Sequence, residues 1–410
     1  MLALYCPPLN IETMVHKTII IGGGIAGLSC ALKLQEANEN FLLITDNLGG
    51  RIKYSAKDKI NFGAYFVMKT YKNAGKLVAK GKWINPLDVC FHNSSIEKFS
   101  LLHFHTLKHL PELIRFYFAM RQFSAHYEQF KQRCLIMSQK EAMQLDPYIK
   151  TLYSKPANDF IKEKRFTKVA DDYISKFSYA CTGVVPDQIN ALDFLNVSMG
   201  ILQPIYNLTF DEKELSDRFR DQLITDTINT IEKEDGQFIL SGASGTKYES
   251  MNIVLATPAS VTKNLLKKEH IRGACKIYVY HVEAELKKAY RRFTLNLFGT
   301  SSEIMLTAKQ ANGSYLIYSR EKETDLSKVC VKFNLITMVP WEKAMYVFGD
   351  IFLEQEPDEG IYIAGDHNGL GLEPASISGI FAANSIINLS RLNPLSSGTE
   401  PGSRALPRVS

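Results

Sequence analysis

The segment KTIIIGGGIAGL, residues 17–28, constrains the fold of this chain more than any other. An apolar run typical of a buried strand leads directly into Gly22, Gly24 and Gly27, and apolar residues then recur at helical spacing. In this G-x-G-x-x-G pattern the first glycine permits a tight turn, the second admits a pyrophosphate, and the third allows close helix-strand packing. The segment therefore predicts a Rossmann-like dinucleotide-binding unit, with a glycine turn that holds no ligand as the alternative.

The second strand of this unit, FLLI at 41–44, ends at the position where an acid normally binds the adenosine ribose. Here that position falls on Thr45 or Asp46. A threonine hydroxyl accepts a hydrogen bond more weakly than a carboxylate, whereas an acid one residue late could also be an exposed turn residue. We expect Asp46 to hold the ribose and keep Thr45 as the alternative.

Three further segments carry a resemblance to a known family. LGGR at 48–51 resembles the signature of the flavin-containing amine oxidase superfamily, which includes monoamine oxidases, protoporphyrinogen oxidases and phytoene-type desaturases. INFGAYFV at 60–67 is similar to the superfamily's D-x-G-A segment beside the flavin, with Asn61 in place of the acid. The segment at 360–386, which begins GIYIAGD, is similar to its C-terminal FAD motif.

The resemblance implies FAD as the cofactor and assigns residues to it. FAD would be noncovalent, because Val331 to Asp366 lacks the cysteine through which monoamine oxidases attach it. Asp366 would bond the ribityl chain or a phosphate-side hydroxyl, and Ser376 with Ile377 would present the start of the last helix to the flavin ring. The expected cofactor-binding residues are Gly22, Gly24, Ile25, Ala26, Gly27, Thr45, Asp46, Gly49, Gly50, Arg51, Gly63, Ala64, Ile228, Ala256, Gly365, Asp366, Ser376 and Ile377.

One catalytic residue also follows from the resemblance. ACKIYVYHVE at 274–283 resembles the strand in amine oxidases whose lysine is bridged by water to flavin N5, and the match falls on Lys276. A buried lysine there would position water or oxygen and stabilise the negative charge on reduced flavin. The alternative is a strand lysine that points into solvent.

The expected reaction is net hydride transfer from a substrate C-H, next to nitrogen or to another C-H, to flavin N5, with oxygen as the reoxidant and peroxide as its product. Ser376 stands where amine oxidases place a tyrosine of the aromatic cage, which weakens the case for a simple amine. The first alternative is a desaturase or porphyrinogen-type oxidase of a bulky apolar substrate. The second is a flavin-binding structural or interaction protein without catalysis.

The predicted fold class is α/β, a doubly wound FAD-binding domain with an interleaved α+β substrate domain. The FAD-binding domain is expected from residues 15–70, 205–265 and 345–392. The substrate domain is expected from a helical insertion at 71–204 and a mixed sheet at 266–344, with flexible ends at 1–14 and 393–410.

Composition and charge restrict the classes of partner that we expect for this chain. The net charge of +5 without a long basic run does not favour nucleic acid. Seven scattered cysteines, no signal peptide and no spanning apolar run lead us to expect a cytoplasmic protein.

The basic and aromatic helix at 101–130 would permit peripheral membrane contact. His105 and His109 share a helical face, which permits a metal pair, but no carboxylate completes a set. We therefore interpret them as surface histidines and predict no metal site. The sequence does not indicate an oligomeric state.

Overall fold

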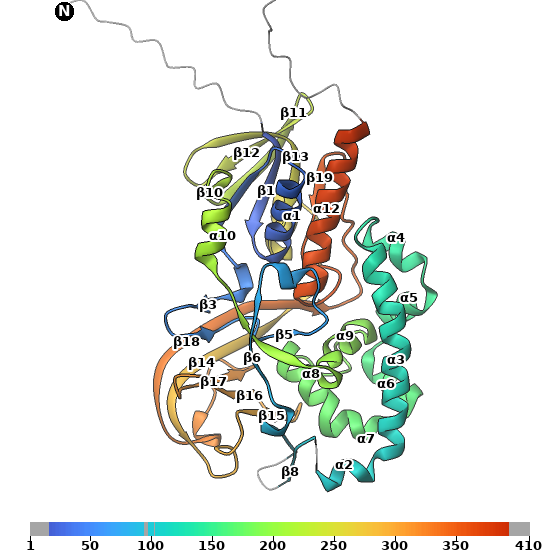
Figure 1. Ribbon diagram of the computed structural model, residues 1–410, viewed down its shortest axis with the longest axis vertical. Helices are drawn as coiled ribbons and strands as arrows, with labels where there is room; N and C mark the ends of the chain where they lie inside the picture. The colour runs from blue at the N-terminus through green and yellow to red at the C-terminus, as the bar shows by residue number, and fades with distance from the viewer. Residues whose placement is uncertain (1–15, 94–96, 102, 393–410) are drawn as a thin grey trace, which may run out of the picture.

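The computed structural model describes residues 16–93, 97–101 and 103–392, which form two sheets and a layer of helices (Figure 1). Both expected flexible ends, and Cys6 with them, lie outside the described residues. Among the described residues the six cysteines are free, and no helix is both long and apolar enough to cross a bilayer.

The first sheet is mainly parallel, as the nucleotide-binding prediction requires. Its strands β10, β2, β1 and β13 lie side by side in this order and run parallel. The C-terminal half of β13 pairs in parallel with β19, while its N-terminal half pairs with the antiparallel meander β12 and β11. The strands are β1 (His16–Gly23), β2 (Leu42–Leu48), β10 (Leu223–Thr225), β11 (Ile228–Glu234), β12 (Gln237–Gly242), β13 (Lys247–Leu255) and β19 (Ile361–Ile363).

Two helices from opposite ends of the chain cover one face of this sheet. Helix α1 (Ile25–Glu36) and helix α12 (Leu372–Leu392) run side by side across it (Figure 1). They meet at Gly379, where an added Cβ would lie 2.0 Å from the carbonyl oxygen of Ala26. No side chain larger than hydrogen fits at this crossing, so the glycine fixes how closely the last helix approaches the nucleotide-binding unit.

The second sheet has the strand order β18, β14, β17, β16, β15, β7, β8 and is antiparallel except for the β15–β7 pair. The predicted mixed sheet is thus present. It also takes in two strands from residues 89–99, where the sequence suggested helix. Its strands are β7 (Val89–His92), β8 (Lys98–Phe99), β14 (Gly273–Leu286), β15 (Leu295–Phe298), β16 (Ile304–Lys309), β17 (Tyr315–Ser319) and β18 (Cys330–Phe348).

The predicted helical insertion packs against the second sheet, and the two share the largest hydrophobic core (Figure 1). Its elements are α2 (Phe104–Lys108), α3 (Leu110–Arg133), α4 (Gln139–Gln144), α5 (Pro147–Ser154), α6 (Ala157–Lys164), α7 (Thr167–Val169), the π-helical turn η4 (Ala170–Ile174), α8 (Ser175–Thr182) and α9 (Ala191–Leu202). Helices α10 (Glu212–Arg218) and α11 (Ala259–Leu265) flank the first sheet.

Two small sheets and four 3-10 turns complete the described structure. The small sheets are β3 (Tyr54–Ser55) with β4 (Ile60–Asn61), and β5 (Phe66–Met68), β9 (Ile205–Thr209) and β6 (Ala79–Trp83); the turns are η1 (Gly50–Ile52), η2 (Ala74–Lys76), η3 (Pro86–Asp88) and η5 (Leu326–Lys328). The domain boundaries drawn from the sequence stay a proposal. Strand β18 crosses one of them at residue 345, and β9, from the FAD-binding part, pairs with β6, from the substrate part.

Candidate functional site

A single cavity of about 560 Å³ extends from the glycine loop after β1 to the second sheet. The loop contributes Gly22 and Gly24, and the far end is lined by residues such as Phe177 on α8, Leu297 on β15 and Tyr318 on β17. The cavity therefore connects the predicted nucleotide site with the predicted substrate domain. Of the expected cofactor residues it includes Gly22, Gly24, Ile25, Ala26, Thr45, Asp46, Gly49, Gly50, Arg51, Gly63, Ala64, Ile228, Ala256, Gly365 and Asp366.

The glycines of the loop have distinct tasks. Gly22 has φ +109°, and an added Cβ would lie 2.6 Å from the carbonyl oxygen of Ala256. At Gly27 a Cβ would lie 1.9 Å from the carbonyl oxygen of Gly22, so this residue brings helix and strand together and does not line the cavity. A Cβ on Gly24 would meet nothing within 4 Å. Gly24 thus leaves open space on the cavity side, where a phosphate group could approach the backbone.

The start of α1 is suited to an anion. Gly24 is its N-cap, no side chain caps it, and its first turn carries no acidic residue. The N-H groups of this turn are consequently not held by a capping side chain, and the helix dipole places partial positive charge there. This is the environment that a pyrophosphate requires.

Thr45 and Asp46 have different roles. The Thr45 hydroxyl accepts from the backbone N-H of Gly23 at 2.9 Å and donates to the carbonyl of Asn47 at 2.7 Å. The Asp46 side chain is exposed and lines the cavity. Because the Thr45 hydroxyl is engaged in shaping the loop, Asp46 is the better placed of the two to bind a ribose, and this assignment stays a proposal.

Arg51 and Asp366 form an ion pair in the cavity wall. The Arg51 guanidinium also donates to the carbonyl of Ala344 at 3.1 Å. Burial raises the pKa of Asp366, but the charge and hydrogen bond of Arg51 outweigh it and hold the pKa below its usual range. The carboxylate therefore stays ionised, and the pair joins the GGR segment to the C-terminal motif.

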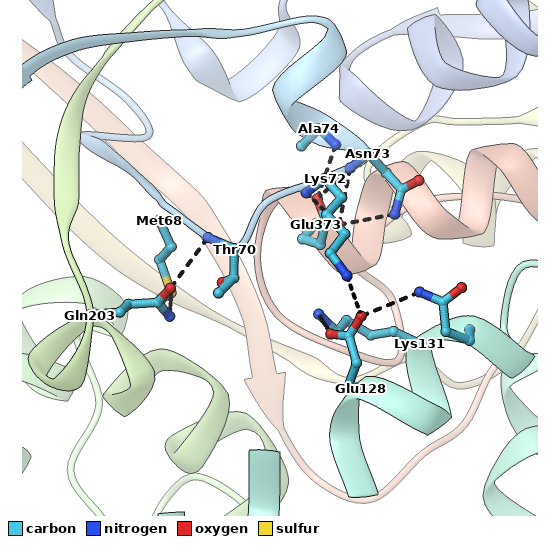
Figure 2. A network of polar contacts seen from close by, with 10 residues as sticks. Met68, Thr70, Lys72, Asn73, Ala74, Glu128, Lys131, Gln203 and Glu373 are labelled. Carbon is cyan, nitrogen blue, oxygen red and sulfur yellow. Dashed lines mark hydrogen bonds and ion pairs between the residues drawn. The ribbon is translucent and has the colours of Figure 1, made fainter. Parts of the chain in front are cut away.

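The buried carboxylate of Glu373, in the first turn of α12, fixes the neighbouring wall (Figure 2). It accepts hydrogen bonds from the backbone N-H groups of Lys72, Asn73 and Ala74 at 3.0–3.2 Å. Tyr71, which precedes these residues, lines the cavity. The Lys72 ammonium extends the network to Glu128 on α3, as Figure 2 shows. One carboxylate on the last helix thus holds the segment that carries Tyr71.

Ser376 and Ile377 do not reach the cavity, contrary to the expectation from the sequence. Helix α12 begins at Leu372, four residues before Ser376, so Leu372 and Ala375 provide the wall instead. The Ser376 hydroxyl lies 2.8 Å from the hydroxyl of Ser29 on α1, and the Ile377 side chain is buried in the main core.

The assignment of Lys276 as a catalytic residue is wrong for this structure. Its side chain is 60% exposed and its ammonium lies 3.2 Å from the carboxylate of Glu342 on β18. The residues of β14 that line the cavity are Ile277 and Val279. Within the described lining Arg51 is the only basic residue.

The apolar end of the cavity contains residues that the sequence did not single out. Tyr318 on β17 lines the cavity, whereas Tyr278, Tyr280 and Tyr315 of the same sheet belong to a separate core. Trp341 on β18 is half-buried and lines the cavity. The lining residues that the sequence did not single out include Phe62, Tyr65, Phe66, Met68, Tyr71, Ile84, Phe177, Ala180, Cys181, Thr182, Asn196, Val197, Ile205, Ile277, Val279, Leu295, Leu297 and Leu306.

Comparison with known proteins identifies the fold. A family model described as an NAD(P)-binding Rossmann-like domain matches residues 20–80, and no curated protein sequence matches the chain. A single-substitution mutant of putrescine oxidase, from a structure-based redesign of cofactor binding, superposes with a TM-score of 0.68 at 13% identity, covering 92% of this chain and 100% of that one. The chain has the amine oxidase fold.

Two further structures with the amine oxidase fold differ in their named reactions. Cyclohexylamine oxidase from Brevibacterium oxydans IH-35A gives a TM-score of 0.57 at 13% identity over 92% of this chain and 98% of that one. A CLA-producing fatty acid isomerase from P. acnes gives 0.61 at 13% identity over the same shares. One of these structures is named as an amine oxidase and the other as a fatty acid isomerase, so the likeness in fold does not specify the substrate.

The described residues fit FAD. The uncapped start of α1 and the open side of Gly24 suit a pyrophosphate, Asp46 lies near the end of β2 where a ribose would be held, and the cavity continues past Arg51 and Asp366 to the apolar end.

Proposed function

We propose that the protein is an FAD-dependent oxidoreductase that acts on a bulky apolar substrate. The observation that carries the proposal is the continuous cavity, which joins a phosphate-binding loop to an apolar end formed by helices α8 and α9 and the second sheet. The amine oxidase fold supports it. The noncovalent attachment of FAD, and oxygen as the final electron acceptor, belong to the same proposal.

The distribution of charge favours an apolar substrate over an amine. The charged residues of the described lining are Asp46, Arg51, Asp226 and Asp366. Asp46 lies on β2 and Asp226 follows β10, both in the nucleotide-binding sheet, and the other two pair with each other. An ammonium group at the apolar end would lose its hydration without gaining a carboxylate, which is costly. We therefore place desaturation, or another oxidation of an apolar C-H, ahead of amine oxidation.

The chain's own contribution to such a reaction is binding, orientation and exclusion of water. When bound, FAD would supply the acceptor for a hydride from the substrate. The apolar walls hold the substrate and keep water from the reacting carbon. Burial raises the pKa of Tyr65 to about 12, so its phenol stays protonated and can orient a substrate by donating a hydrogen bond. It is a poor general base at neutral pH.

The first experiment tests cofactor and substrate class together. The purified protein should show the visible absorption of oxidised flavin, and anaerobic addition of fatty acids, polyenes or porphyrinogens should bleach it, while primary amines should not. A colourless protein that added FAD does not restore would contradict FAD binding. Bleaching by amines alone would reverse the substrate assignment, and bleaching by none of the panel would favour a non-catalytic flavoprotein.

A matched pair of variants tests the apolar end. Val279→Thr adds a hydroxyl to the cavity wall at nearly constant volume and should raise KM for an apolar substrate several-fold, with the FAD content unchanged. Val331→Thr, on an exposed position of the same sheet, should change neither value. Equal effects of the two substitutions would show that Val279 does not contact the substrate.

Peripheral membrane contact and a cytoplasmic location stay predictions. Helix α2 and the first half of α3 expose a row of large apolar side chains, which is the pattern expected for contact with a lipid surface. The row comprises Phe104, Leu107, Leu110, Ile114, Tyr117 and Phe118.

A further inference from the structure

Three potential metal ligands converge outside the cavity. His105 lies on α2, His109 lies between α2 and α3, and Asp172 lies on the π-helical turn η4, which follows α7; Figure 1 shows α2 and α7 together at one end of the helical layer. The Nε2 atoms of the two histidines lie 2.7 Å and 3.4 Å from the same Asp172 oxygen and 3.3 Å from each other. The sequence suggested a histidine pair without a carboxylate, and the fold provides the carboxylate.

The distances between these atoms are those of a zinc site. Zinc bonded to nitrogen and oxygen at about 2.0–2.2 Å in a tetrahedron separates its ligand atoms by about 3.3–3.6 Å. The His105–His109 separation and the His109–Asp172 separation lie within or close to that range. The remaining separation, between His105 and Asp172, would have to widen by about 0.6 Å. A small rotation of one side chain achieves this.

Neighbouring groups already hold the three side chains in place. The Asn93 amide donates to the second oxygen of Asp172 at 3.0 Å, so the first oxygen is left facing the histidines. The ring of Phe99 stacks on the His105 imidazole with centroids 3.8 Å apart. Support of this kind fixes ligand orientation in metal sites. Each of the three side chains is 14–20% exposed, which leaves room for a water ligand.

Some groups around His105, His109 and Asp172 oppose the binding of a cation, and others favour it. Lys176 is a competing cation near Asp172, but its ammonium donates to the backbone carbonyl of Asp171. The two imidazole Nε2 atoms face one carboxylate oxygen and also each other. If both carried protons, those protons would crowd each other, whereas one metal ion satisfies all three atoms.

We infer that His105, His109 and Asp172 bind one Zn²⁺ ion, with water at the open position. Two imidazoles and a carboxylate, with water at the fourth position, form a ligand set that Zn²⁺ takes in sites that keep one position open. None of the three residues lines the cavity, so the ion would have no part in the proposed oxidation. Its effect would be structural, because it would tie α2 and the start of α3 to η4. The inference does not depend on the proposed function.

The test is zinc binding to the full-length protein prepared without a histidine tag. Titration calorimetry with Zn²⁺ should give one equivalent per chain, and Asp172→Asn, which keeps the side-chain shape, should weaken binding at least tenfold. His126→Gln is the control, because His126 pairs with Asp146 in the same helical layer but has no second histidine in that pair. This variant should bind zinc as tightly as the unmodified protein does. The inference is overturned if the unmodified protein binds no zinc or if Asp172→Asn binds it equally well.

A second measurement does not require a variant. Hydrogen exchange of the unmodified protein should slow in residues 103–113 when Zn²⁺ replaces EDTA, because the ion would hold this segment against η4. Exchange in α5 and α6, which contribute no ligand, should stay the same. Zinc that leaves exchange at 103–113 unchanged would overturn the assignment to these three residues.

Discussion

The cavity wall is formed by backbone atoms at the nucleotide end and by side chains at the apolar end. At the nucleotide end the wall is backbone, brought to the surface by glycines such as Gly22 and Gly24. At the apolar end it is side chains, among them Phe177, Leu297 and Tyr318, from three separate elements. A backbone wall cannot be altered without moving the chain, whereas a side-chain wall can change one residue at a time. Cofactor binding should therefore be intolerant of substitution and substrate preference adaptable.

The largest effect is expected from Gly27→Ala. Its Cβ would lie 1.9 Å from the carbonyl oxygen of Gly22, a backbone atom that cannot move aside, so the free energy of unfolding should fall by about 4 kcal/mol or more and FAD should be lost. Gly24→Ala should instead leave the apoprotein's stability nearly unchanged and weaken FAD binding at least tenfold. Urea denaturation and FAD titration measure both. Similar instability in the two variants would contradict the division of tasks within the loop.

The second largest effect is expected from loss of the buried ion pair between Arg272 and Asp193. Arg272 donates to Asp193 at 2.8 Å with both side chains almost fully buried, and Asp193 also accepts from the N-H of Leu370 at 3.0 Å. Arg272→Met should lower the free energy of unfolding by about 3–5 kcal/mol, because it leaves a buried carboxylate unpaired. Lys276→Met removes an exposed pair nearby and should change stability little. Urea denaturation of the two variants measures the difference.

Lys276→Met also checks the corrected position of that lysine. The rate at which oxygen reoxidises the reduced flavin should equal that of the unmodified protein. Slower reoxidation would return Lys276 to the site, and equal stability losses in the Arg272 and Lys276 variants would contradict the contrast between buried and exposed pairs.

Acidic pH should lower the free energy of unfolding through His367, which follows Asp366 at the nucleotide end of the cavity. Burial lowers the pKa of His367 to about 4, below the value near 6.5 of an unfolded chain. The unfolded state then binds more protons between these values, so this contribution to stability is complete above about pH 6.5 and is lost as the pH falls towards 4. His367→Asn should reduce the dependence of unfolding free energy on pH by about 1.4 kcal/mol per pH unit in that window.

The control for His367 is His270→Asn, at an exposed position. Urea denaturation of both variants and the unmodified protein across the window gives the three slopes. If His367→Asn and the unmodified protein have the same slope, the histidine is not held neutral in the folded state.

The smallest effect separates Thr45 from Asp46. Thr45→Val removes two hydrogen bonds inside the loop and should lower the free energy of unfolding by about 1–2 kcal/mol. Asp46→Ala should leave stability unchanged and weaken FAD binding several-fold. Urea denaturation and FAD titration of the two variants measure these effects. If Thr45→Val weakens FAD binding and Asp46→Ala does not, the Thr45 hydroxyl holds the ribose instead.

The nucleotide end could be predicted from the sequence because its geometry is local. Gly22, Gly24 and Gly27 determine a turn and a helix within a few residues of themselves, and the second strand follows at a fixed distance. The start of α12 was placed too late because the motif gives the helix but not its first residue. Ser376 and Ile377 were therefore assigned to a wall that Leu372 and Ala375 provide.

The errors elsewhere came from contacts that the sequence pattern does not encode. Strand β14 buries both of its faces, with Ile277 and Val279 in one core and Tyr278 and Tyr280 in another. Apolar alternation therefore could not tell which side Lys276 takes, and the structure turns it to solvent. Asp172 was missed as a partner of the histidine pair because it is more than 60 residues away and sits on a π-helical turn.

The order of segments in the first sheet has a consequence for synthesis of the protein. Strand β19, Asp366 and helix α12 follow β1 and α1 by more than 300 residues in the sequence, yet they complete the sheet and the cavity wall begun by β1 and α1. A nascent chain emerging from the ribosome thus carries an exposed glycine loop and an incomplete sheet edge until β19 and α12 have emerged as well. An unpaired sheet edge can pair with another chain, so the risk of aggregation lasts until these distant segments have emerged and docked.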